Sequence, residues 1–357
     1  MPREGAVDAL RALALLPVVA VNWVGYYTGP YGGPLGPAQP EGSAMGLAAM
    51  FAVAALLASK GITFLTFLFG YSQGLSRRAR GEQAVPVRKR RMGRLLALGL
   101  LHGLFLYSGD ILTLYAVCGF ITLRWSGLRL RQLRRRMLWL AGLELAFMLA
   151  FTPLVLYYDR PAPAAATVGA GTWLANNVSG YLSSQLVQLT FGLLLPLGLM
   201  AAGLLAARLR LFSHPRWRPA LARCARYWLW RGLLVNLAWG AALCVAFNTG
   251  AGRWGDLLYG YGGFVALPLL AGLVPLLVLA AQRGGAFMRA LQPAGRHTLS
   301  LYILSSVLSL ALFSGAGLAL PLGTAALAAL ALLYWAGWVK LAPRLNGRLP
   351  LEAWLSR

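Results

Sequence analysis

Long apolar runs alternate along the whole chain with short stretches that are rich either in arginine or in glycine and proline. Several runs have the roughly 20 residues that an α-helix needs to cross about 30 Å of hydrocarbon. We therefore predict an all-α, polytopic transmembrane helix bundle of about ten helices. It would form one integral membrane domain, 1–357, with N-terminal helices in 1–158 and C-terminal helices in 182–357. The expected helical segments are 6–27, 45–59, 61–75, two in the hairpin 92–125, 137–158, 182–207, 227–247, 258–281, one that begins near 297, and 322–340.

The composition supports this prediction and excludes a soluble domain. Of the 357 residues, 59% are hydrophobic and 12% are charged, and the mean hydropathy is +0.64. A soluble domain has about a quarter of its residues charged. The three cysteines, Cys118, Cys224 and Cys244, are scattered without a CxxC pair or a metal-ligand spacing. We therefore expect no bound metal, no other bound cofactor and no disulfide framework.

Basic residues outnumber acidic ones by 33 to 9, which gives a net charge of +24. They cluster between the apolar runs, as cytosolic loops of membrane proteins require. Both chain ends are therefore expected in the cytosol, with only Lys60, Arg160 and Arg253 on the outer side. The expected partners are the lipid bilayer and anionic lipids at the cytosolic loops. Nucleic acid is not expected, because no groove-reading motif accompanies the charge; a homo-oligomer stays open.

Two of the expected segments, 45–59 and 61–75, are shorter than a full span. The stretch 28–44 is rich in glycine and proline and has no Lys or Arg, so it predicts an outer loop. Because arginines follow from Arg77, the two short segments together predict one broken helix that returns the chain inward, although 45–59 alone could span, re-enter or lie in the interface. Lys60 lies at the break and is a candidate to bind an anionic substrate group.

Three further features are expected in the middle of the chain. Helix 137–158 includes Glu144, an intramembrane carboxylate that needs a partner. An outer loop is expected over 159–181, and a kink near Pro196 in helix 182–207.

The first helix carries a stripe of polar residues, because Asp8, Arg11 and Asn22 follow one another at spacings that repeat on one helix face. Such a stripe is expected to face the bundle and not the lipid. Two interpretations stay open: Asp8 and Arg11 neutralise each other as an anchoring pair, or the stripe contacts a substrate, with Arg11 as a donor to a phosphate.

The hairpin 98–120, LGLLHGLFLYSGDILTLYAVCGF, contains the only clearly intramembrane histidine, His102. Polar groups at this depth are costly, so they mark candidate functional sites. Asp110 opens the second helix and is expected to cap it. Asp110 is eight residues from His102, about 10 Å along a helix axis. We therefore expect no direct bond between the two, and place Tyr115 opposite His102.

The helix that begins near 297 carries hydroxyl groups at Thr298, Tyr302, Ser305 and Ser309, again on one stripe, and Arg296 precedes it. Such hydroxyl groups often bond to backbone carbonyls and hold helices together. The alternative is that Arg296, Tyr302 and Ser305 contact a substrate. Both interpretations stay open.

Several stretches, in order and over nearly the whole chain, resemble the YeiB family of bacterial inner-membrane proteins, whose members carry a domain of unknown function in their C-terminal half. The HG…GDIL…Y pattern is the most specific of them. The matching stretches are VDALRALALLPVVAVNW, KGITFLTFLFGYSQGL, LGLLHGLFLYSGDILTLYAVCGF, GRHTLSLYILSSVLSLALF and PLEAWL.

The resemblance implies a relation to membrane acyltransferases, among them lysosomal heparan N-acetyltransferase and the O-antigen acetylase type, which transfer an acyl group from cytosolic acyl-CoA. The first helix of the acetylase type begins with Asp-x-x-Arg, which Asp8 and Arg11 look like, and carries a histidine where this chain has Asn22. An amide cannot act as a general base near neutral pH. The base would therefore have to be another residue, and His102 is the residue type suited to it.

Three function classes stay open. The first is a membrane acyltransferase in the bacterial inner membrane with acyl-CoA as cosubstrate, His102 and Asp110 as catalytic residues, and a lipid, glycan or small molecule as acceptor. The second is a transporter or flippase, and the third is a non-catalytic membrane protein. The residues expected to bind substrate are Asp8, Arg11, Asn22, Lys60, Tyr115, Arg296, Tyr302 and Ser305.

Overall fold

The structure is a computed structural model that describes residues 5–28, 42–157, 170–190, 192–249, 251–345 and 347–356. Within these ranges every regular element is helical, as the hydrophobic pattern predicts. The α-helices are α1 (Gly5–Thr28), α2 (Ala44–Ala52), α3 (Lys60–Arg80), α4 (Ala84–Phe105), α5 (Leu112–Trp125), α6 (Leu130–Tyr157), α7 (Ala170–Thr190), α8 (Leu194–Arg208), α9 (Arg218–Asn248), α10 (Gly252–Gly260), α11 (Gly262–Gln282), α12 (Ala286–Arg296), α13 (Thr298–Phe313), α14 (Thr324–Leu341) and α15 (Pro350–Ser356).

Among the described residues, six helical stretches are long and apolar enough to cross a membrane, or eight when each of two bent pairs counts as one span. The bent pairs are α7 with α8, at 62°, and α12 with α13, at 72°. About ten helices were expected from the sequence. This count takes α2, α3 and α4 together as one stretch of 62 residues, although the chain breaks before Lys60 and again at Gly81, and it leaves out α5, which has 14 residues. It therefore does not contradict the expected number.

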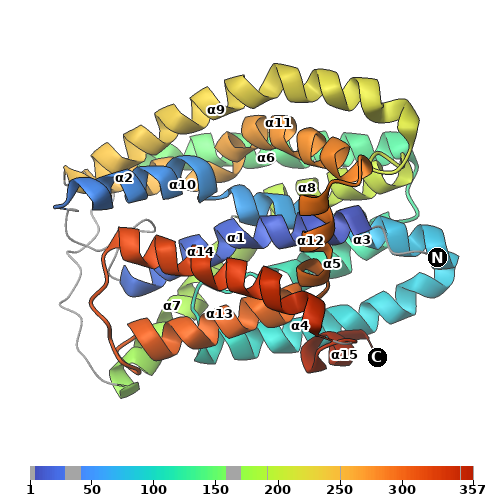
Figure 1. Ribbon diagram of the computed structural model, residues 1–357. Helices are drawn as coiled ribbons and strands as arrows, with labels where there is room; N and C mark the ends of the chain where they lie inside the picture. The colour runs from blue at the N-terminus through green and yellow to red at the C-terminus, as the bar shows by residue number, and fades with distance from the viewer. Residues whose placement is uncertain are drawn as a thin grey trace.

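Helix α1 lies in the middle of the bundle and contacts α3, α12, α13 and α14 (Figure 1). Two indole groups bond across this centre. Trp335 Nε1 on α14 donates to the carbonyl of Ala12 at 2.7 Å, and Trp23 Nε1 on α1 donates to the carbonyl of Ser305 at 3.0 Å. Because a tryptophan N–H needs a partner inside an apolar bundle, these bonds fix α1 against α13 and α14.

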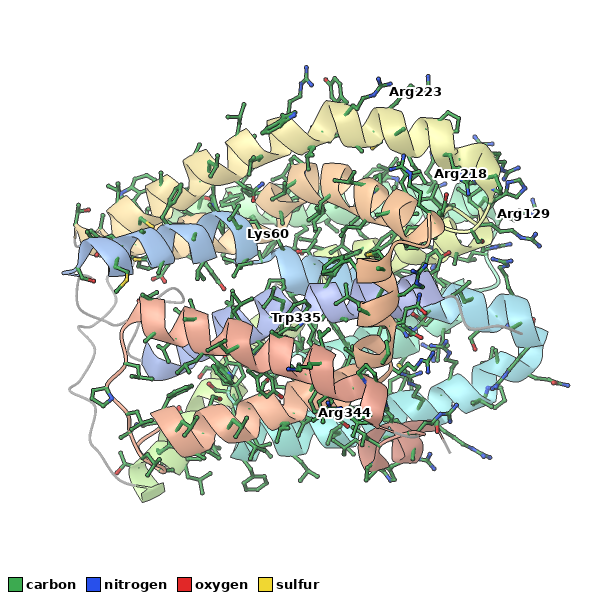
Figure 2. The ribbon with its side chains drawn as sticks, in the orientation of Figure 1. Lys60, Arg129, Arg218, Arg223, Trp335 and Arg344 are labelled. Atoms are coloured by element: carbon green, nitrogen blue, oxygen red, sulfur yellow. The ribbon has the colours of Figure 1, made fainter. Side chains whose placement is uncertain are left out.

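The two short segments that the sequence predicts as a broken helix do form one. Helix α2 continues into a π-helical turn, Val53–Leu57, and the chain then breaks at Ala58 and Ser59 before α3 begins at Lys60. Ser59 has a φ of 64°, in the left-handed region that a residue with a Cβ rarely adopts. Lys60 therefore lies at the junction of two half-helices, as Figure 2 shows.

The predicted kink near Pro196 is present as the 62° bend between α7 and α8, but the region differs from the sequence prediction in one respect. Helix α7 begins at Ala170, so 170–181 is helical and not part of an outer loop, whereas 159–169 lies outside the described residues. The bend precedes Leu194, and Pro196 is the third residue of α8. A proline in the first turn of a helix lacks only an N–H that has no partner in the helix, so Pro196 begins α8 without kinking it.

Glu144 on α6 lies against the start of α8, close to the backbone N–H groups of Leu194 and Leu195, while its buried Oε2 atom has no hydrogen-bond partner. Backbone N–H groups at a helix N-terminus have no partner inside the helix and favour a negative charge. The partner that the sequence argument required for Glu144 is therefore a helix end and not a cationic side chain.

Arg129 and Arg218 lie at the same end of the bundle as both chain ends (Figures 1 and 2). Arg253, which the charge pattern assigns to the outer side, donates to the carbonyl of Leu156 at the last turn of α6, at 2.9 Å. A cation at a helix C-terminus is favourable. The arrangement matches the expected topology with both ends on the arginine-rich side; Arg160 lies outside the described residues.

Helices α3 and α8 pack backbone to backbone through Gly70 and Gly203. A Cβ on Gly70 would overlap the carbonyl oxygen of Met200, and one on Gly203 would overlap that of Phe67. Small residues allow this approach in membrane bundles, where packing drives helix association.

We predict that Gly203→Val lowers the stability of the bundle by about 1–3 kcal/mol, because its side chain must separate two backbones. Thermal unfolding in detergent, followed by gel filtration, measures the effect. The control is Gly142→Val on α6, where an added Cβ meets nothing within 4 Å. Equal unfolding temperatures for both variants would contradict the packing described.

Candidate functional site

The α4–α5 hairpin brings His102 and Asp110 into direct contact. His102 Nδ1 lies 2.8 Å from Asp110 Oδ1, and both side chains are fully buried. The sequence argument expected no direct bond, and this expectation is wrong. It assumed that the helix continues, but α4 ends at Phe105 and the turn that follows folds Asp110 back beside His102.

Asp110 also caps α5, as the sequence predicts. Its Oδ1 accepts the N–H of Leu112 at 3.1 Å and its Oδ2 accepts that of Thr113 at 2.8 Å. Both oxygens of the carboxyl group thus accept a backbone N–H, so the group also acts as an acceptor in its contact with His102. The hydrogen in the bond with His102 therefore belongs to Nδ1, which leaves the lone pair of Nε2 available as an acceptor.

Nε2 of His102 lies 2.9 Å from the hydroxyl oxygen of Ser306 on α13. With Nδ1 protonated, the Ser306 hydroxyl group is the donor, so Ser306, His102 and Asp110 form a directed chain of hydrogen bonds. Ser306 was not a candidate in the sequence analysis, which favoured Ser305. His102 and Ser306 are 204 residues apart, so no local spacing in the sequence predicts their contact.

Aromatic rings surround this chain. The Tyr302 ring lies 4.9 Å from the His102 ring between centroids, and the Tyr107 ring lies 6.4 Å away, edge on. Burial raises the pKa of the Tyr107 phenol, in the turn after α4, well above its usual value. Tyr107 is therefore a neutral side chain near neutral pH and adds no charge beside His102.

A cavity of about 780 Å³ opens among α1, α3, α4, α5, α12, α13 and α15. Eight arginines and only two carboxylates, Asp8 and Glu352, line it. The rest of its lining includes leucines, Phe69, Tyr115 and Tyr302. The arginines are Arg11, Arg78, Arg80, Arg88, Arg91, Arg210, Arg296 and Arg348.

The cavity reaches deep into the bundle. Arg88 lines its outer part, and Ile111 and Leu112 of α5 line its inner end. The start of α5 is level with Gly99 of α4, since a Cβ there would lie 2.6 Å from the backbone nitrogen of Thr113. From Arg88 to Gly99 the helix rises about 16 Å. His102 lies about one turn beyond that level, so the Ser306–His102–Asp110 chain adjoins the inner end.

Five of the residues predicted from the sequence to bind substrate line this cavity: Asp8, Arg11, Tyr115, Arg296 and Tyr302. Asp8 and Arg11 form the ion pair considered above, at 2.8 Å, while the other Arg11 nitrogen donates to the Ser72 hydroxyl group. Tyr115 is not opposite His102 as expected, because Gly99 lies against Thr113 and His102 is therefore nearer the start of α5. The Tyr115 hydroxyl group donates to the carbonyl of Ile62 on α3 at 2.9 Å.

The other three residues that were predicted to bind substrate do not line the cavity. Lys60 Nζ donates to the carbonyl of Ala54 at 3.0 Å and lies 4.4 Å from the centre of the Trp239 ring. Asn22 does not line the cavity, and its buried Nδ2 has no hydrogen-bond partner. The Ser305 hydroxyl group donates to the carbonyl of Tyr302 at 2.7 Å. The structure therefore does not bring these three side chains to the cavity.

Comparison with known proteins finds similarity without a stated activity. The sequence model of a family described as "Protein of unknown function (DUF418)" matches residues 206–346. "Uncharacterized protein YxaH" of Bacillus subtilis (strain 168) is 31% identical over 156 residues, which is 42% of this chain and 38% of that relative. The match thus spans about two-fifths of the relative's length. The family match includes Arg296, Tyr302 and Ser306 but neither His102 nor Asp110.

We predict that Asp110→Ala unfolds at a lower temperature than Asp110→Asn. Alanine leaves two backbone N–H groups of α5 without a partner, and loss of an N-cap costs about 1 kcal/mol. Asparagine has one acceptor oxygen, so it keeps one of the two backbone bonds of the cap and loses the carboxylate bond to His102. Thermal unfolding of both variants in detergent measures the difference, and equal unfolding temperatures would contradict the capping role.

Proposed function

We propose that this protein is a membrane acyltransferase that takes an acyl group from cytosolic acyl-CoA and transfers it to a lipid, glycan or small-molecule acceptor. The observation that carries the proposal is the cavity itself. Its outer part is lined by arginines, its inner part is apolar, and its inner end adjoins the buried His102–Asp110 pair.

The arginines match the phosphate groups of coenzyme A. Guanidinium groups bind phosphate oxygens through paired N–H donors and keep their charge under all physiological conditions. Eight arginines and two carboxylates line the cavity, so an excess of positive charge remains for an anion to balance. A pyrophosphate with a further phosphate, as in coenzyme A, supplies such an anion from the cytosol.

The apolar inner part matches the acyl chain and its thioester. Leu65, Leu68 and Leu95 line the cavity beyond the arginines, and Ile111 and Leu112 close it. An acyl chain that enters this part leaves water, which is favourable by about 25 cal/mol for each Å² of apolar surface buried. A donor held in this orientation presents its thioester near His102, the base that acyl transfer needs.

The acceptor is expected to approach from the opposite face. Helix α4 begins near the arginine-rich end and ends at the turn that carries Asp110. The charge pattern assigns this turn to the outer side of the membrane. The resemblance to the YeiB family supports the proposed chemistry and a bacterial inner-membrane location.

A transporter or flippase is the second candidate, because arginines around a cavity also suit the headgroup of an anionic lipid. It predicts that a labelled phospholipid crosses proteoliposome membranes without covalent change. A non-catalytic membrane protein predicts neither binding of acyl-CoA nor lipid movement.

Arg296→Gln is expected to weaken binding of octanoyl-CoA by about tenfold or more. A hydrogen bond with a charged group contributes about 1.5–3 kcal/mol, and about 1.4 kcal/mol corresponds to tenfold. Isothermal titration of the purified protein measures the affinity. Arg223→Gln is the control, because Arg223 is exposed on α9 and does not line the cavity. Equal losses in both variants would show that the cavity is not the binding site.

His102→Ala is expected to abolish hydrolysis of octanoyl-CoA, the slow side reaction in which water replaces the acceptor, while expression stays intact. A positioned base contributes about 10²- to 10⁴-fold to such a step. Release of free coenzyme A measures the rate. An unchanged rate in this variant would exclude His102 as the base.

A further inference from the structure

We infer that Ser306 is a nucleophile that receives the acyl group as an ester before the acceptor takes it. This inference rests on the proposed function, because it concerns the same donor and the same cavity. It adds a covalent intermediate and assigns it to a residue that the sequence analysis did not name.

The hydroxyl group of Ser306 differs from those of the neighbouring buried serines. Serines inside helices usually donate to the carbonyl three or four residues back. Ser305 and Ser309 do so, at 2.7 and 3.0 Å. Ser306 is 3.4 Å from the carbonyl of Tyr302 and 2.9 Å from His102 Nε2. Its short contact is therefore with a base on another helix and not with its own helix.

The chemistry of the contact is that of an activated serine. The Asp110 carboxylate fixes the proton on Nδ1, so Nε2 can take the Ser306 proton, and the carboxylate stabilises the imidazolium that forms. Among the described residues, His102 is the basic side chain within ion-pair distance of Asp110. The Asp110 carboxylate thus caps α5 with both oxygens, and the Oδ1 atom that accepts from Leu112 also lies 2.8 Å from His102 Nδ1.

The position of Tyr302 connects Ser306 with the cavity. Tyr302 lies one helical turn before Ser306, lines the cavity and packs its ring on His102. A thioester at the inner end of the cavity therefore contacts the Tyr302 ring. Rotation of that ring opens the path to the Ser306 oxygen, and the closed position keeps water from it.

The reaction has two balanced steps. In the first, the Ser306 oxygen attacks the thioester carbon, His102 Nε2 takes the hydroxyl proton, the carbon–sulfur bond breaks, and the sulfur leaves as coenzyme A with that proton. In the second, the acceptor hydroxyl or amine attacks the serine ester while His102 takes its proton. The carbon–oxygen bond to Ser306 breaks, and His102 returns the proton to the Ser306 oxygen.

The test is to incubate the purified full-length protein with octanoyl-CoA, without acceptor, and to locate the added acyl group by mass spectrometry. We expect an octanoyl ester on Ser306 in the wild-type protein and in Ser309→Ala, a matched buried serine on the same helix. Ser306→Ala is expected to carry no label. His102→Asn is expected to slow labelling by about 100-fold or more.

Ser306→Cys keeps the test informative if the alanine variant fails to fold. A cysteine there is expected to form a thioester that neutral hydroxylamine releases, whereas the serine ester needs alkaline hydroxylamine. Binding and turnover of octanoyl-CoA with no label, or an equal rate in Ser306→Ala, overturns the role of Ser306 and leaves the proposed function standing. Absence of octanoyl-CoA binding in the wild-type protein overturns both.

Discussion

The buried charge of Asp110 is the constraint on which this end of the bundle depends. A carboxylate inside an apolar bundle is tolerated only when donors surround it. The donors are the first N–H groups of α5 and Nδ1 of His102 on α4. His102 in turn accepts from Ser306 on α13. Three helices that are far apart in the sequence therefore meet at one charge, and displacement of any of them leaves a buried polar group without its partner.

The positions of the arginines are a second constraint. The positive-inside rule requires only that basic residues lie in cytosolic loops. Arg11, Arg88 and Arg296 instead belong to helices and line a deep cavity. Two of them have partners in the protein: Arg11 pairs with Asp8 and also donates to Ser72, and Arg88 donates to the carbonyl of Ser72. These two arginines are thus held in place beside the cavity, so their positions are not explained by topology alone.

The sequence predicts the features that depend on local pattern. The helices follow from hydrophobic runs, the break before Lys60 from short segments, and the cap by Asp110 from its place before α5. It does not predict the His102–Asp110 bond, because that depends on where α4 ends. Ser306 could not be predicted, since a serine next to Ser305 in an apolar helix carries no signal of a partner 204 residues away.

The arginines line one part of the cavity and His102 adjoins its inner end. This separation explains why an aromatic side chain lies between them. In the reaction that we propose, the arginines attract an anion from the cytosol, whereas proton transfer at His102 needs a dry, fixed surrounding. Tyr302 belongs to both regions, because it lines the cavity and packs its ring on His102. An aromatic side chain meets this requirement, since it excludes water and turns about few bonds. In the reaction that we propose, the step that joins binding to transfer is therefore the movement of one ring, and the helices on either side need not move.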